Sequence, residues 1–153
     1  MKRNLMAVLD PGGEPVREIA ISRSDADLLC AAAGERGSSA AQADLTACFD
    51  KETFLARVAE ALEFPDWFGR NWDAFFDCLT DLSWLPAGGH VLVLLNTNEM
   101  RRDAPEAFDT AKSIMQEAAA IWAKRGQSLR VIVDRPTTRP KRPPRLNRKR
   151  RKT

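Results

Sequence analysis

Residues 90–95, HVLVLL, decide the fold class, because this short run is almost wholly apolar. Six residues are too few for a stable helix, so the run predicts a strand that is buried on both faces. A second run of the same kind, LRVIV, occupies residues 129–133. Strands buried on both faces are typical of parallel sheets that are covered by helices.

Helical patterns separate these runs. Asp50 is a suitable cap for a helix whose apolar residues continue to Leu62, and Asn71 for a helix through Leu82. Residues 103–125 repeat apolar side chains at helical spacing, with Asp103 and Glu106 as candidate caps. Together with a strand expected at 43–49, this alternation predicts an α/β fold. The expected core is a small three-stranded, mainly parallel sheet packed with helices, with strands near 43–49, 90–95 and 129–133.

Residues 1–37 are predicted to be an N-terminal extension that contains one helix, and residues 38–133 the main domain. The extension has a strong turn signal, DPGGEP, between LMAVL and VREIAI, which are candidates for short strands. Ser24 and Asp27 form a capping-box-like pair for the helix, and Gly34 is expected to end it.

Charge divides the chain into an acidic body and a basic tail. The net charge is +3, but residues 134–153 hold ten Lys or Arg and one Asp, a net of +9, so residues 1–133 carry −6. The tail has no core-forming residue except Leu146, which predicts disorder. An acidic body favours a basic partner. The tail favours weak, non-specific RNA binding, for which the candidates are Arg142, Arg145, Arg148, Lys149, Arg150, Arg151 and Lys152.

The inventory of reactive residues argues against an enzyme. The one histidine, His90, begins a predicted buried strand, and Cys30, Cys48 and Cys78 lack metal or disulfide spacing. There is no phosphate loop or dinucleotide fingerprint. We therefore expect no enzyme activity, no cofactor and no metal. No apolar run approaches membrane-spanning length and none at the start suits a signal peptide, so a cytoplasmic protein with reduced thiols is expected.

The helix expected after Asn71 carries an unusual acidic stripe. Asp73, Asp77 and Asp81 recur every four residues and so fall on one face, where like charges repel each other. In the short loop before this helix, the adjacent Trp67 and Phe68 are hard to bury together. An exposed aromatic beside acids is typical of an interface. The alternative is a solvated helix face with both rings in the core.

Residues 64–82, FPDWFGRNWDAFFDCLTDL, resemble the inhibitory helix of the barstar family and the loop before it. The likeness extends more loosely over residues 40–133. Order and spacing agree at Pro65, the acid at 66, the aromatics at 67 and 68, Gly69, Asn71, Asp73, Ala74, the aromatic at 76, and Asp77-Cys78-Leu79-Thr80.

This resemblance implies a protein that binds and blocks the active site of a small, secreted, guanyl-specific ribonuclease similar to barnase. It implies that Asp77 imitates a substrate phosphate, that Asp73 pairs with a further basic group, and that Trp67 packs on the enzyme. The partner-binding residues it implies are Trp67, Phe68, Gly69, Asn71, Asp73, Phe76, Asp77 and Thr80.

The sequence departs from the inhibitor of barnase at two positions. Arg70 stands in place of an acid, and Ile121 aligns with a glutamate of the later helix. Two other functions also stay open: a nucleic-acid-binding protein that acts through the basic tail, and a barstar-like module that binds another basic protein.

Overall fold

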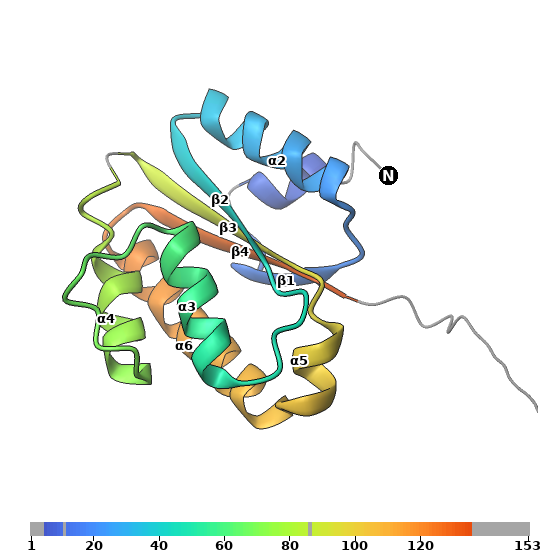
Figure 1. The fold of residues 1–153 in the computed structure, drawn as a ribbon. Coiled ribbons are helices and arrows are strands. Elements are labelled where there is room, and N and C mark those ends of the chain that lie inside the picture. The colour runs from blue at the N-terminus through green and yellow to red at the C-terminus, as the bar shows by residue number, and fades with distance from the viewer. Residues whose placement is uncertain (1–4, 11, 86, 136–153) are drawn as a thin grey trace, which may run out of the picture.

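The structure, a computed structural model, describes residues 5–10, 12–85 and 87–135. Its centre is a parallel sheet of four strands in the order β1-β4-β3-β2 (Figure 1). The strands are β1 (Val16–Ile19), β2 (Ser38–Asp44), β3 (Gly89–Leu95) and β4 (Ser128–Asp134). The predicted α/β class with a parallel sheet is confirmed, and the predicted count of three strands is wrong by one.

Helices cover both faces of this sheet (Figure 1). One face carries the 3-10 turn η1 (Ala7–Leu9) and α2 (Arg23–Glu35). On the other side lie α3 (Lys51–Ala61), α4 (Trp72–Asp81) and α6 (Pro105–Lys124), with the short α5 (Asn98–Asp103) before α6.

Strand β3 is the centre of the hydrophobic core, since all seven of its residues are buried. Val91, Val93 and Leu95 face the core under α2, and Leu92 and Leu94 face the core under α3 and α6. The alternation follows from the two-residue period of a strand. A strand apolar on both faces is therefore confirmed at this position.

Strands β1 and β2 differ from the prediction, in the number of strands and in the bounds of one, because both depend on pairing with strands that are distant in sequence. The fourth strand, β1, joins the sheet by pairing Val16 with Val131 of β4. Strand β2 spans Ser38–Asp44 instead of 43–49, and its sequence, SSAAQAD, is small and polar. Pairing along the whole of β3 makes this stretch a strand despite its low intrinsic preference.

Helix ends test the predicted caps. The Asp50 side chain accepts from the Thr53 N–H at 2.8 Å and the Asn71 side chain from the Ala74 N–H at 2.7 Å, so both predicted caps are confirmed. The cap of α2 is Ser22, two residues before the predicted Ser24, and it forms a capping box with Asp25.

The helix predicted over 103–125 is confirmed as α6, which begins two residues later, at Pro105; the short α5 before it was not predicted. Proline lacks an N–H and disfavours a helical conformation in the residue before it, and Ala104 has φ −139° and ψ 58°. Neither Asp103 nor Glu106 caps α6 through its side chain.

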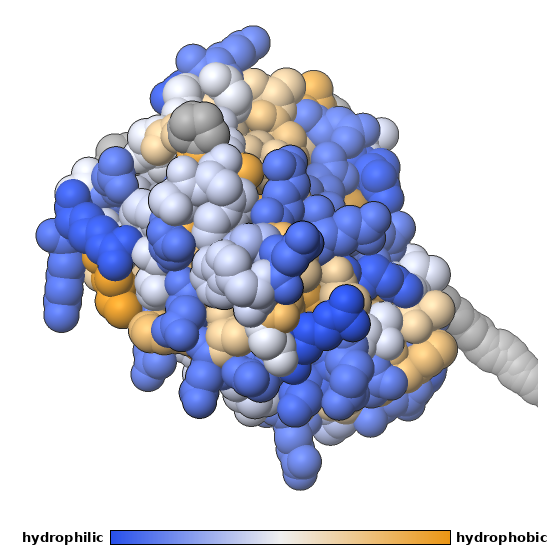
Figure 2. All heavy atoms as spheres, turned by 60° about the vertical axis from the view of Figure 1, so that its left-hand side comes forward, coloured by the Kyte–Doolittle hydropathy of each residue, from blue (hydrophilic) through white to orange (hydrophobic). Residues whose placement is uncertain are grey.

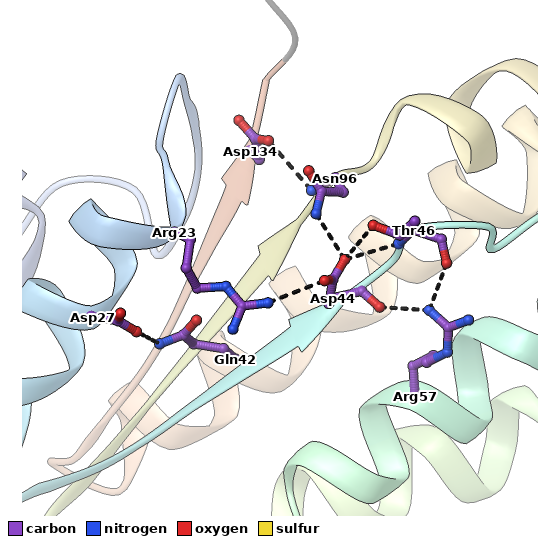
Figure 3. A network of polar contacts seen from close by, with 8 residues as sticks. All are labelled: Arg23, Asp27, Gln42, Asp44, Thr46, Arg57, Asn96 and Asp134. Atoms are coloured by element: carbon purple, nitrogen blue, oxygen red, sulfur yellow. Dashed lines mark hydrogen bonds and ion pairs between the residues drawn. The ribbon is translucent and has the colours of Figure 1, made fainter.

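A polar network joins the N-terminal elements to the rest of the sheet (Figure 3). The Asp44 carboxylate, at the end of β2, accepts from Arg23 at 3.1 Å, from the Thr46 hydroxyl at 2.7 Å and from the Asn96 amide at 2.8 Å. Asp134 accepts from the N–H groups of Ile21 and Asn96. The network therefore connects the start of α2 with the ends of β2, β3 and β4.

The sequence predicts a tail that begins at Asp134, but this residue is the last of β4 and part of the network. The Arg135 N–H also donates to the Ile19 carbonyl at 2.9 Å. Asp134 and Arg135 therefore belong to the folded domain and not to the predicted tail. The seven candidate nucleic-acid-binding residues, from Arg142 to Lys152, lie outside the described residues.

The Asp44 network makes stability depend on pH. Hydrogen bonds from Asn96, then from Thr46, lower the pKa of Asp44 from 3.8 to about 2. A group with a lowered pKa stabilises the fold above pH 3.8 and loses this contribution as pH falls toward 2. We expect Asp44→Ala to unfold at lower urea concentration than the parent at pH 7, with a difference that shrinks between pH 4 and 2. The matched control is Asp109→Ala, an exposed α6 position; a pH-independent difference for Asp44→Ala would contradict the assignment.

Candidate partner-binding surface

Helix α4 is amphipathic, which sets the direction of each site residue. Phe75, Cys78 and Leu79 are buried, and the helix packs mainly on α6. The opposite side of α4 carries Asp73 and Asp77 into solvent, as expected for residues one turn apart. Burial of the apolar side thus fixes where the acidic side points.

The acidic stripe consists of Asp73, Asp77 and Asp81, all exposed. Within the described part of the chain, none of the three carboxylates accepts a hydrogen bond or forms an ion pair. Several carboxylates elsewhere have structural roles: Asp50 caps α3, and Glu18 binds Arg101 at 2.8 Å and Lys112 at 2.6 Å. The stripe therefore concentrates negative charge that forms no stabilising contact within the described part of the chain.

The loop before α4 separates its two adjacent aromatic residues. Trp67 is 62% exposed, whereas Phe68 packs against the core with its ring 4.9 Å from that of Phe64. The prediction that one of this pair is exposed is confirmed. Trp67 is also supported from the side, because the ring of Trp84 lies edge-on to it at 6.4 Å.

Trp84 is a site neighbour that the sequence did not single out. Its indole N–H donates to the Leu62 carbonyl at 2.8 Å, and its ring contacts that of Phe64 at 6.0 Å. It follows α4 in sequence and returns to the loop before α4 only in three dimensions, so no local pattern marks it. Figure 2, which brings the side of α4 forward, shows a mainly hydrophilic surface with small apolar areas between charged residues.

The loop backbone turns at Arg70, which has φ +57°, and not at Gly69. A left-handed conformation costs a non-glycine residue about 1–2 kcal/mol. Asn71 then caps α4 through its side-chain oxygen. Arg70 and Asn71 together set the angle at which the loop enters the helix.

The other residues implied by the family resemblance lie on the same element. Phe76 is half-buried on α4, and the Thr80 hydroxyl donates to the Phe76 carbonyl at 3.0 Å inside the helix. All eight implied positions are thus brought together on α4 and its preceding loop. Ile121 is half-buried on α6, the helix against which α4 packs.

The buried face of α4 also contains the thiol of Cys78, whose pKa is raised. Burial, and then the negative charges of Asp77 and Asp81, raise the pKa of Cys78 to about 11. A metal site and a membrane span were also considered. Among residues 5–10, 12–85 and 87–135, no group of three or more His, Cys, Asp or Glu side chains is placed to hold a metal ion. No helix within the same ranges is long and apolar enough to cross a membrane.

Residues 39–134 match the protein family described as barstar, the barnase inhibitor. This chain belongs to the barstar family. The match begins in β2 and ends with β4, so it includes α4 and its loop and leaves out β1 and α2. A comparison with curated proteins found no match.

The repulsion within the acidic stripe predicts how Asp77→Ala changes the stability of the protein without a partner. Asp77→Ala removes a repulsive charge and places a better helix former in mid-helix, so we expect unchanged or slightly higher stability, by up to about 0.5 kcal/mol. Asp50→Ala, which removes the α3 cap, should instead lower stability. Urea unfolding measures both. A clear loss of stability in Asp77→Ala would show that this carboxylate has a structural partner.

Proposed function

We propose that this member of the barstar family binds and blocks the active site of a small guanyl-specific, barnase-like ribonuclease through α4 and the loop before it. The observation that carries the proposal is the acidic stripe: three exposed carboxylates without partners in the described structure, on a helix packed into the core. The family's description as a barnase inhibitor supports it at the level of the family.

The mechanism is electrostatic substitution for the substrate. A ribonuclease active site gathers positive charge to bind phosphate, and a carboxylate can accept the same hydrogen bonds. Asp77 lies at the centre of the stripe and would take the place of a phosphate, with Asp73 on a neighbouring basic group. Trp67 would pack on the rim of the enzyme, as exposed aromatics do in interfaces.

Two features would make this binding favourable. Helix α4 is ordered before the partner arrives, so little conformational entropy is lost on association. The acidic body, −6 over residues 1–133, would accelerate the approach of a basic enzyme. The partner would be a secreted ribonuclease, and the inhibitor would act in the cytoplasm of the cell that makes it.

Titration of ribonuclease activity tests the proposal. Barnase and the ribonucleases of the source cell are assayed with both RNA and a guanylyl dinucleotide, while the full chain is added. We expect loss of both activities at a 1:1 ratio, because the active site is covered. Loss of RNA cleavage alone would indicate that the basic tail sequesters RNA, and no loss with any of these enzymes would contradict the proposal.

Asp77 should contribute most to inhibition. We expect Asp77→Ala to weaken binding by several kcal/mol, mainly through faster dissociation, because it leaves desolvated positive charge unpaired. The size of this expected loss in binding free energy is the one known for charge pairs between barnase and barstar themselves. Asp81→Ala should have a much smaller effect, and Asp109→Ala, on the exposed surface of α6, none. Inhibition by Asp77→Ala as tight as that of the parent would refute the role of α4.

The basic tail should be separable from inhibition. A chain that ends at Arg135 keeps β4 and the Asp134 hydrogen bonds, so we expect it to fold and to retain the inhibition constant of the full chain. Circular dichroism checks the fold, and the dinucleotide assay checks inhibition. A folded chain of this length that no longer inhibits would place the binding surface in residues 136–153.

A further inference from the structure

The last turn of α4 has carbonyl groups that its own helix cannot satisfy. Helices leave their final carbonyls without intrahelical donors. The Cys78 carbonyl accepts from the Leu82 N–H at 3.1 Å, with Leu82 in a left-handed conformation at φ +47°. The carbonyls of Leu79 and Thr80 need donors from elsewhere.

The end of α6 supplies both donors. The indole N–H of Trp122 donates to the Leu79 carbonyl at 2.7 Å, in a buried position. The guanidinium of Arg125 donates to the Thr80 carbonyl at 2.5 Å. Two consecutive carbonyls of α4 are thus held by two side chains that lie one turn apart on α6.

Both donors are themselves fixed in place. The guanidinium of Arg125 lies 5.0 Å from the centroid of the Trp122 ring, and that ring lies 5.0 Å from the ring of His90, edge to face. Nδ1 of His90 is 2.7 Å from the Ser39 hydroxyl. A continuous set of contacts therefore runs from β2 through β3 and α6 to the end of α4.

Core filling alone does not account for this arrangement. A phenylalanine would supply an apolar ring at position 122, but it has no N–H to donate to the Leu79 carbonyl, as the indole of Trp122 does. The end of α4 also needs support, since Asp81 lies at its unfavourable C-terminal end and Leu82 is left-handed. The positive charge of Arg125 there offsets the helix dipole.

We propose that Trp122 and Arg125 are positioning residues of the inhibitory surface. They hold the last turn of α4 on α6 and so fix Asp77 and Asp81, while the Asn71 cap fixes the first turn. This inference rests on the proposed function. It adds a second element, the end of α6, to the residues that determine how tightly the acidic stripe binds.

Amide hydrogen exchange in the full chain, without any partner, tests the first half of the proposal. Trp122→Phe keeps the ring and removes the N–H, Arg125→Met removes the guanidinium, and Arg125→Lys keeps a charged donor. We expect exchange at residues 78–82 to become about tenfold faster in the first two variants, the scale of one lost hydrogen bond, and to recover in Arg125→Lys. Exchange in β3 should not change.

The control is Arg36→Met, an exposed arginine whose side chain binds Asp10 far from α4. Unchanged exchange at residues 78–82 in both Trp122→Phe and Arg125→Met would overturn the proposal. So would an equal acceleration in α4 and β3, because that result would show a general loss of stability.

A double-mutant cycle with barnase tests the second half. Trp122→Phe should weaken inhibition about tenfold and reduce the effect of Asp77→Ala, but leave the effect of Trp67→Ala unchanged, because only Asp77 is fixed through the end of α4. A general loss of stability would not distinguish Asp77 from Trp67. Tight inhibition by Trp122→Phe would overturn the proposal. If the parent does not inhibit barnase, binding to this enzyme fails, and the exchange data alone uphold or overturn the positioning role.

Discussion

The burial of β3 on both faces is the constraint on which the rest of the structure depends. All seven residues of β3 are buried, between β2 on one side and β4 on the other. Such a strand requires a helical layer on each face, and α2 supplies one layer while α3 and α6 supply the other. Helix α4 is placed mainly through α6, the element with which it makes most of its contacts. The position of the acidic stripe therefore depends on the contact between α4 and α6, together with the packing of Phe75 on Phe54 of α3.

The contrast between two kinds of carboxylate connects this architecture to function. Asp44 and Glu18 form hydrogen bonds or ion pairs that join elements of the fold, and Asp50 caps α3. Asp73, Asp77 and Asp81 repel one another on a single helix face and have no such contacts among the residues that the structure describes. A stable core permits this local cost, since most helix stability comes from tertiary packing. An unfavourable charge pattern on a well-packed helix is what a binding surface for a basic partner requires.

The sequence predicted those features that local chemistry determines. The apolar run of β3 was sufficient to identify a buried strand, and Asp50 and Asn71 were correctly identified as caps because the residue types of a cap are few. Strand β2 could not be located, since SSAAQAD carries no apolar pattern and becomes a strand only by pairing with β3. The stretch VREIAI was a candidate strand, but its place in the sheet could not be predicted, because it depends on pairing with β4 more than 100 residues later.

The site shows the same division. The period of the aspartates and the crowding of Trp67 beside Phe68 were visible in the sequence. The left-handed Arg70, the support of Trp67 by Trp84, and the contact of Trp122 with the Leu79 carbonyl depend on the folded chain. No local pattern links positions 43 residues apart, as Leu79 and Trp122 are.

The central claim is that α4 and the loop before it cover the active site of a ribonuclease. Amide hydrogen exchange of the full chain, alone and saturated with a barnase-like ribonuclease, tests it most directly. The account predicts that protection on binding is concentrated in residues 65–82, with a smaller change at the end of α6. Protection confined to η1 and α2, on the opposite face of the sheet, would contradict it.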